Sequence, residues 1–408
     1  MLKDRLISEW VQVFDTHEHF GDIGNYSPQK PTIDLAKVFK GAYMYVPRHF
    51  KRMSAVLQSR LGADALNSLR LAFKQLYDID ILPIQPEKLE LLNSKIKEAY
   101  KDPNYIYHTL TQKLKITNVI LDIKPDLWED WKHPIVQTTI RIDDVTFPFV
   151  KLDSYMYRPW NAKNQIEHYA ENLNVSLNTL ENFDDALEKY FNSLRYMANT
   201  IKIGSAYERS IHFLYEKNED GEITKIYDKM QKKEVINEKE MRRWGNYVIT
   251  ALLEYARKEK LPVQIHTGMA SMVETNPIYL LDIMRKFSDV KFDIFHGGYP
   301  FHHTIPGILT QRYNAHVDLC WMPILSQSAT KRLLTELIEM NCTDKTFAFG
   351  GDCENLEGTY GALLVIKDIL AEVLVGFIEA KKFSFSDAVA IGNKMLYENP
   401  KKIFSRAL

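Results

Sequence analysis

Two histidines separated by one residue, His17 and His19, end the first apolar run of the chain. Residues i and i+2 of a β-strand point to the same side. Both imidazoles can therefore reach one ion while Thr16 and Glu18 face elsewhere. Surface histidines also fall at this spacing by chance. The preceding residues VQVFD (11–15), however, are typical of a buried strand and favour a metal site.

Three further apolar runs stop at a residue that could bind a metal or carry a proton. His266 ends LPVQIH, His296 ends VKFDIFH, and Asp352 follows TFAFGG. Glycine lies within two residues of each, and glycine permits sharp turns and close approach of the backbone. One such residue is more often hydrogen-bonded locally than metal-bound. Because such a residue recurs at four strand ends, we expect these residues to form one shared site.

Short β-branched runs alternate with longer helical stretches, which predicts parallel strands joined by helices. In a closed barrel of this kind the carboxyl ends of the strands share one face, where active sites lie. We therefore expect an α/β fold, a (β/α)8 TIM barrel. The expected strands are 11–15, 116–122, 146–153, 199–204, 261–266, 290–296, 316–319 and 346–350.

The chain has 408 residues, more than the roughly 250 of a typical barrel, and two segments account for the excess. Residues 21–110 follow strand 1 and indicate a helical insertion. Residues 207–237 follow strand 4, and their two alternating runs around Glu219-Asp220-Gly221 indicate a smaller, hairpin insertion. Either could be a lid or specificity element, or an extension of the scaffold. We expect residues 1–408 to form a single barrel domain that includes both.

The composition is that of an ordinary globular protein, with 45% hydrophobic and 26% charged residues and a net charge of −1. This charge gives no basis for binding nucleic acid or an anionic membrane. The first ten residues lack the apolar core of a signal peptide, and the three cysteines form no disulfide or metal pattern. We expect a cytoplasmic protein that acts on a small-molecule substrate and could form a homo-oligomer.

The ordered motifs resemble those of the amidohydrolase superfamily, and more closely its amidohydrolase-related branch. That branch includes aminocarboxymuconate-semialdehyde decarboxylase and the amidohydrolase-like domain of glutamine-synthetase-related proteins. The resemblance runs from residue 11 to 404, but residues 21–110 have no counterpart in it. The ordered motifs are specific for the superfamily but say little about the substrate. The matching motifs are HEH (17–19), KIGSAYER around Lys202, HTG at His266, HGGYP at His296 and GGD at Asp352.

The resemblance implies a divalent cation, most commonly zinc, held by His17, His19, His266 and Asp352. Zinc accepts imidazole nitrogen and carboxylate oxygen as ligands. Binding lowers the pKa of a coordinated water from about 15.7 to about 7. Asp352 would also take the proton of that water. His296 would act as a general acid or base, or else bind a second ion.

Lys202 bears on the number of ions. In binuclear members of the superfamily a lysine at the end of strand 4 is carboxylated and bridges two ions. Lys202 could instead be a substrate-binding ammonium or part of a structural ion pair. We expect one ion, or two if Lys202 is carboxylated. Arg209 and Tyr207 could bind a substrate carboxylate and Tyr299 could cover the site, although structural roles are open for all three.

Hydrolysis of a small-molecule amide, lactone or ester by a metal-activated water is the leading prediction. The first alternative is a non-hydrolytic enzyme, either a decarboxylase or a uronate-type isomerase. Large insertions after strand 1 also occur in uronate isomerases, whereas a histidine at the end of strand 6 is not a mark of them. The second alternative is a catalytically silent barrel that serves as a binding module.

Overall fold

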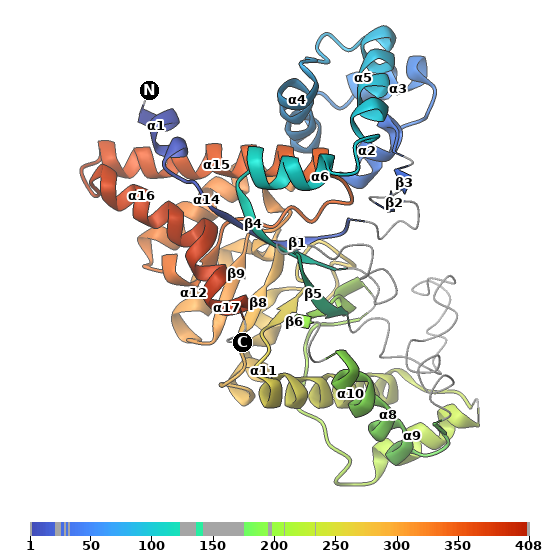
Figure 1. Cartoon of the computed structure of the whole chain (residues 1–408). Helices are drawn as coiled ribbons and strands as arrows, with labels where there is room; N and C mark the ends of the chain where they lie inside the picture. The colour runs from blue at the N-terminus through green and yellow to red at the C-terminus, as the bar shows by residue number, and fades with distance from the viewer. Residues whose placement is uncertain are drawn as a thin grey trace. The chain divides into compact units, whose positions relative to one another are not determined.

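Figure 1 shows a computed structural model of the chain, which describes residues 2–20, 26–27, 30–31, 33–122, 136–141, 175–194, 198–207, 209–232 and 234–405. Eight strands form one sheet, in which hydrogen-bonded neighbours follow the order of the chain. The pairs β1–β4, β4–β5, β6–β7, β7–β8 and β9–β10 are parallel. The strands are β1 (Val13–Glu18), β4 (Ile116–Leu121), β5 (Val136–Arg141), β6 (Ala198–Ile203), β7 (Val263–Ile265), β8 (Phe292–Ile294), β9 (Ala315–Asp318) and β10 (Thr346–Phe347).

Seven of these strands overlap the segments expected from the sequence. The third strand is different: it is Val136–Arg141, whereas residues 146–153, which we expected to form it, lie outside the described residues. Both segments are rich in β-branched or aromatic residues, so β-propensity alone does not separate them. A short antiparallel pair, β2 (Tyr26–Ser27) and β3 (Lys30–Pro31), lies in the sequence between β1 and β4.

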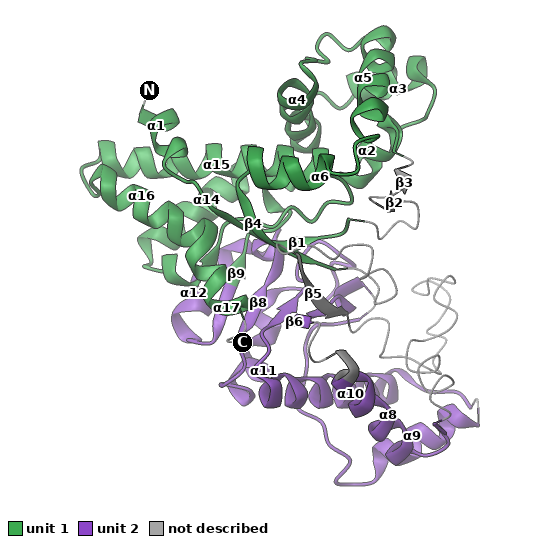
Figure 2. Cartoon of the chain, in the orientation of Figure 1, with its two compact units in different colours: residues 1–138, 317–408 green, residues 139–316 purple. Residues whose placement is uncertain are grey.

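The chain divides into two compact units, which are coloured separately in Figure 2. Unit 1 comprises Met1–Thr138 and Val317–Leu408, and unit 2 comprises Thr139–His316. The boundaries fall within β5 and β9, so each of these strands begins in one unit and ends in the other. The two units are described separately below.

In unit 1, alternate residues of β1 have different surroundings. Phe14 packs in a buried cluster with Ile120, Phe347 and Phe404, and its ring lies 6.0 Å from that of Phe404 in the C-terminal helix α17 (Asn399–Phe404). Because successive side chains of a strand point to opposite faces, Asp15 and His17 face away from this cluster. The apolar residues of β1 therefore fix the orientation of the histidine.

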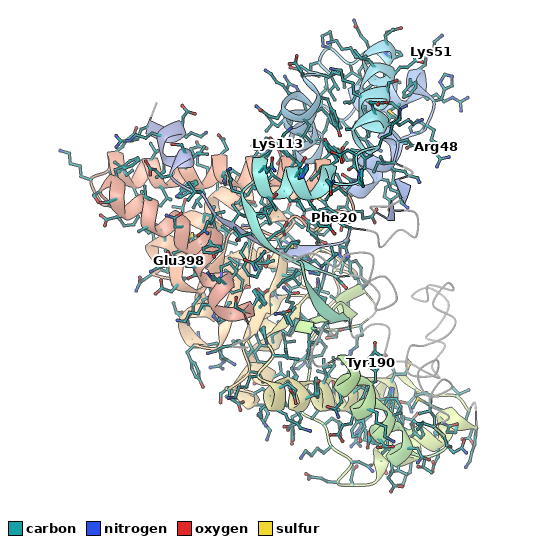
Figure 3. The ribbon with its side chains drawn as sticks, viewed as in Figure 1. Phe20, Arg48, Lys51, Lys113, Tyr190 and Glu398 are labelled. Carbon is teal, nitrogen blue, oxygen red and sulfur yellow. The ribbon has the colours of Figure 1, made fainter. Side chains whose placement is uncertain are left out.

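The described residues of unit 1 between β1 and β4 include five α-helices, in the segment for which a helical insertion was expected. One of them, α4, packs closely against α15 (Leu356–Glu379): a Cβ added to Gly361 of α15 would lie 2.3 Å from the Ser68 carbonyl oxygen in α4. Arg48 and Lys51 mark this part of the chain in Figure 3. The helices are α2 (Leu35–Gly41), α3 (Phe50–Gln58), α4 (Asp64–Tyr77), α5 (Pro86–Ala99) and α6 (Tyr105–His108).

A buried polar cluster joins these helices to the first turn of α15. The Glu357 carboxylate accepts hydrogen bonds from the hydroxyls of Tyr77 and Tyr100, the latter at 2.8 Å. Tyr105 donates to the Tyr77 hydroxyl at 3.1 Å. Burial raises the pKa of Glu357, while the tyrosine donors lower it. A buried carboxyl that lost these donors would carry a large desolvation cost, so the cluster holds the insertion helices to α15.

In unit 2, helix α10 (Glu238–Glu259) places Trp244 in an aromatic cluster with Phe183 of α8 (Leu180–Leu194) and Tyr227 of α9 (Glu222–Gln231). The expected hairpin in residues 207–237 is wrong, because its second run is the helix α9. The apolar residues of that run recur at a helical spacing and are buried. They are Ile223, Ile226, Tyr227 and Met230.

None of the described helices combines the length and apolar character needed to cross a membrane.

Replacing Tyr100 with Phe removes one donor from the buried Glu357 carboxylate. We expect the free energy of unfolding to fall by about 1–3 kcal/mol, because a charged acceptor loses a hydrogen bond without gaining water. Urea titration measures the change. Tyr45→Phe is the matched control, since Tyr45 is 69% exposed and should change stability by less than about 0.5 kcal/mol. Equal effects of the two variants would contradict this role of the cluster.

Candidate metal centre and a buried histidine pair

In unit 1, β1 brings the two histidines of the HEH motif together. His17 Nε2 and His19 Nε2 lie 3.2 Å apart, with the rings nearly perpendicular. His19 Nδ1 lies 3.3 Å from the Asp122 carbonyl oxygen. A carbonyl can only accept, so Nδ1 is the protonated nitrogen when this bond forms, and the Nε2 lone pair points toward His17. This is the orientation that metal-binding histidines commonly have.

Asp352 reaches these histidines because the segment after β10 runs beside β1. Asp352 N donates to His17 O at 2.8 Å, His19 N to Cys353 O at 3.1 Å, and Thr16 N to Phe349 O at 3.2 Å. The Asp352 Oδ1 atom then lies 3.0 Å from His19 Nε2. The three predicted residues His17, His19 and Asp352 are therefore brought together within unit 1.

The two glycines before Asp352 are required by this close approach. A Cβ on Gly350 would lie 2.5 Å from Thr16 Oγ1, and a Cβ on Gly351 would lie 1.8 Å from Glu18 Oε1. Glu18 has little room to move, because it accepts from Cys353 N at 2.8 Å and from the Thr359 hydroxyl at 2.7 Å. The GGD motif thus positions Asp352 by letting its backbone lie against β1.

The spacing of the ligand atoms fits a small divalent cation. One donor atom each from His17, His19 and Asp352 lies within 4.8 Å of the others. Tetrahedral zinc with bonds of about 2.0–2.1 Å has ligand atoms about 3.3–3.4 Å apart. The two measured separations, 3.2 Å and 3.0 Å, are close to this value. The donor set, two imidazoles and a carboxylate, is one that zinc and related ions accept.

Buried carboxyl groups collect around this site. Among the described residues of unit 1, no lysine or arginine is buried to a comparable degree. Burial raises the pKa of Asp15 to about 7, and burial followed by the charge of Asp15 raises that of Glu18 well above its usual value. A bound cation would offset part of the negative charge of these carboxyl groups. The buried acids are Asp15, Glu18, Asp122, Asp318 and Asp352.

Two side chains that the sequence did not single out lie at this site. Asp122 Oδ2 is 3.6 Å from His17 Nε2, and the Tyr43 hydroxyl donates to Asp352 Oδ1 at 3.2 Å. Asp122 follows the end of β4, as His266 and Asp352 follow their strands, and this pattern could have identified it. Tyr43 had no such signal, since it comes from the loop after α2; its ring packs at a tilt against that of Trp321, with centres 4.8 Å apart.

The backbone is strained at several of these positions. Tyr43, Trp321 and Asp352 have φ angles of 59°, 63° and 51°. A left-handed conformation at a non-glycine residue costs on the order of 1–3 kcal/mol and persists where the surrounding structure enforces it, commonly at functional sites.

Unit 2 holds the other two predicted histidines as a buried pair. His266 Nε2 lies 2.8 Å from the Met269 carbonyl oxygen, and His266 Nδ1 lies 3.0 Å from His296 Nε2. Since the carbonyl only accepts, the neutral His266 ring is protonated on Nε2 and accepts from His296 through Nδ1. Both ring nitrogens of His266 are thus engaged inside unit 2. His296 itself has a left-handed backbone, with φ 64°.

The remaining predicted residues also lie in unit 2. Tyr207 is 40% exposed and its ring lies 4.4 Å from that of His266. Lys202 Nζ lies 3.8 Å from the centre of the Phe295 ring. Tyr299 N donates to His296 O at 2.9 Å.

Arg209 points at helix α10. Its Nη2 donates to Asn246 Oδ1 at 2.8 Å and its Nε to the Ser210 carbonyl at 3.1 Å. A Cβ on Gly245 would lie 1.9 Å from Arg209 Nη1. Burial lowers the pKa of Arg209 to about 10. The guanidinium is therefore occupied by protein groups rather than extended into solvent.

Comparison with known proteins gives matches at two levels. Residues 231–349 match the family model described as Amidohydrolase. Protein fluG of Emericella nidulans is 22% identical over 149 residues, which are 35% of this chain and 17% of that protein. The match thus spans about a sixth of that relative's length. The family match confirms the resemblance over residues 231–349, which include the HTG and HGGYP motifs.

Three solved structures resemble almost the whole chain, each covering 99% of it. A uronate isomerase from Thermotoga maritima has a TM-score of 0.78 at 16% identity, with 97% of that chain covered. A glucuronate isomerase from Caulobacter crescentus has a TM-score of 0.76 at 13% identity, with 93% of that chain covered. A proposed metal-dependent hydrolase from Lactobacillus casei has a TM-score of 0.66 at 15% identity, with 97% of that chain covered. This likeness in fold confirms the predicted (β/α)8 barrel.

Replacing Gly351 with Ala places a methyl group against the Glu18 carboxylate. We expect a loss of about 1–3 kcal/mol in the free energy of unfolding, the usual cost of overpacking, together with weaker metal binding as Asp352 is displaced. Denaturant unfolding and metal titration measure the two effects. Gly376→Ala in α15 is the control, because nothing lies within 4 Å of its added Cβ; it should be neutral or stabilising. A fully stable Gly351→Ala protein would show that the close approach is not required.

Proposed function

We propose that this chain, a member of the amidohydrolase superfamily, is a metal-dependent enzyme that interconverts the aldose and ketose forms of an acidic sugar. The observation that carries the proposal is the likeness in fold to a uronate isomerase and to a glucuronate isomerase, each over 99% of this chain. The His17–His19–Asp352 group supports the metal dependence. The sequence alone favoured hydrolysis, which becomes the second candidate.

His17, His19 and Asp352 would hold the cation. We propose His266 as a fourth ligand, because it also ends a strand of a parallel barrel, whose strand ends share one face. Coordination by His266 would require release of its bond to Met269 O or to His296. When bound, the cation would supply Lewis-acid polarisation of substrate oxygen. Zinc is the expected ion.

The protein groups would supply proton transfer. Aldose–ketose isomerisation moves a proton from C2 to C1 of the substrate, so it needs a base that can serve both carbons. Asp352 is the candidate, and the Tyr43 hydroxyl would hold its Oδ1 in place. His296 is proposed as the acid or base that moves the proton between the substrate oxygens.

The environment of Lys202 supports an ammonium rather than a carboxylated bridge. Its Nζ lies over the face of Phe295, a position that favours the charged form. We therefore propose one ion, and Lys202 as a contact for an anionic substrate. Tyr207 remains a proposed substrate contact because it is partly exposed and lies against His266. Tyr299 remains one as well, whereas Arg209 is less suited because α10 occupies its guanidinium. A cytoplasmic location also remains a proposal.

Hydrolysis of an amide, lactone or ester is the second candidate. It is supported by the likeness to the Lactobacillus casei protein and by the buried His266–His296 pair, since a histidine after strand 6 suits an acid that protonates a leaving group. In that reaction Asp352 would take the proton from the attacking water.

Metal content tests the first step of the proposal. We expect about one equivalent of zinc or another transition metal in protein purified without chelator, measured by plasma mass spectrometry. His17→Ala should lose it, because one of the converging ligands is gone. His303→Ala, at an exposed position, should retain it. Two equivalents would support a bridged pair instead, and no metal after supplementation would contradict the proposal.

Product analysis tests the reaction. The metal-loaded protein should convert D-glucuronate or a related uronate to its keto isomer, followed by NMR, and leave lactones and amides unchanged. Asp352→Asn should lower kcat about 100-fold or more, the usual contribution of a general base. Asp344→Asn is the control, because its side chain is 73% exposed. Turnover of only lactones or amides would favour hydrolysis, and no turnover of either class by the loaded protein would favour the silent barrel.

A further inference from the structure

Unit 2 contains a cavity that the proposed reaction does not use. Its volume is about 500 Å³, and it is lined by α8, α10 and residues 216–219. Small-molecule pockets commonly measure about 300–1,000 Å³. Leu187 and Ala251 contribute aliphatic surface, and Tyr247 and Tyr255 contribute aromatic rings. The Tyr247 ring is itself fixed by stacking on Trp244, with centres 5.8 Å apart.

Asp184 is the unusual acid of this cavity. It is half-buried, and among the residues that the structure describes it has no ion-pair partner. It accepts one hydrogen bond, from the Tyr247 hydroxyl at 2.6 Å. Of the other four acids of the lining, Glu219 is exposed and three already have a cation. These pairs are Glu216–Arg243 (2.7 Å), Glu188–Lys258 (3.1 Å) and Glu254–Arg257 (2.9 Å).

The two lysines that line the cavity do not neutralise Asp184. Lys258 is paired with Glu188, and the Lys217 ammonium lies 5.6 Å from the centre of the Tyr215 ring. The burial of Asp184 disfavours its charged form and raises its pKa, which the Tyr247 hydroxyl only partly offsets. A partly desolvated carboxylate of this kind gains most from a cation that reaches it.

We propose that this cavity binds a small alkylammonium ion, with its ammonium group on Asp184 and its carbon chain against Leu187, Ala251 and the tyrosine rings. An ammonium would donate a charge-assisted hydrogen bond to the carboxylate and would be attracted to an aromatic face if it lay over one. The chain would cover apolar surface that is otherwise hydrated. None of these residues belongs to the proposed metal centre, so the site does not depend on the reaction proposed above.

Calorimetric titration with n-pentylammonium tests this site. The full-length protein should bind it more tightly than 1-pentanol, which has the same chain without the charge, and should not bind pentanoate. Asp184→Asn should weaken binding of n-pentylammonium by about tenfold or more, because the charged acceptor is lost. Asp185→Asn is the matched control, since its carboxylate is exposed and already paired with Lys189; its affinity should equal that of the wild type.

A second variant separates loss of the site from loss of folding. Ala251→Leu places a larger side chain in the cavity and should also abolish binding, and the circular dichroism and melting temperature of each variant show whether it is folded. Equal binding of pentanol and pentylammonium, equal effects of the Asp184 and Asp185 substitutions, or no binding by the wild type at about 10 mM would each overturn the proposal.

Discussion

The hydrogen bonds between β1 and residues 349–353 are the constraint on which the candidate metal centre depends. They bring the backbone of Asp352 to that of His17, two residues that are 335 positions apart. Because the two segments touch at Gly350 and Gly351, any side chain there would push Asp352 out of reach of His19. A short run of backbone contacts thus sets the separation of the side chains that would hold the ion.

The cost of this arrangement is electrostatic. Five acidic residues are buried near the centre in unit 1, and burial raises the pKa of Asp15 and Glu18 because neither charge is fully compensated. Burying charge without a partner is unfavourable, so the site is arranged for a cation. The inserted segment also contributes to the site, because the Tyr43 hydroxyl donates to Asp352. The Glu357 cluster joins the insertion helices to α15, the helix that begins shortly after Asp352.

The fold leaves the reaction open, because barrels of this kind support several chemistries through the residues at their strand ends. The solved structures that resemble this chain include isomerases and a proposed hydrolase. The contacts of this chain that bear on its reaction are local. They are a buried histidine pair in unit 2, a lysine over the face of Phe295, and the hydrogen bond from Tyr43 to Asp352. Reaction type follows from such contacts rather than from strand order.

The sequence by itself determined the barrel class and the pairing of His17 with His19, since strand alternation and the i, i+2 rule are local properties of the chain. It also identified Asp352, because the GGD motif shows where a strand ends and the backbone approaches closely. It misassigned α9, because the residues of that segment fit both an alternating and a helical pattern, and the burial of four apolar residues at helical spacing decided between them. Asp122 carries the same strand-end signal and could have been identified from it, whereas only the tertiary structure revealed Tyr43 and the bonds that occupy His266 and Arg209. These depend on which distant segments meet, and hydrophobic packing over the whole chain decides that.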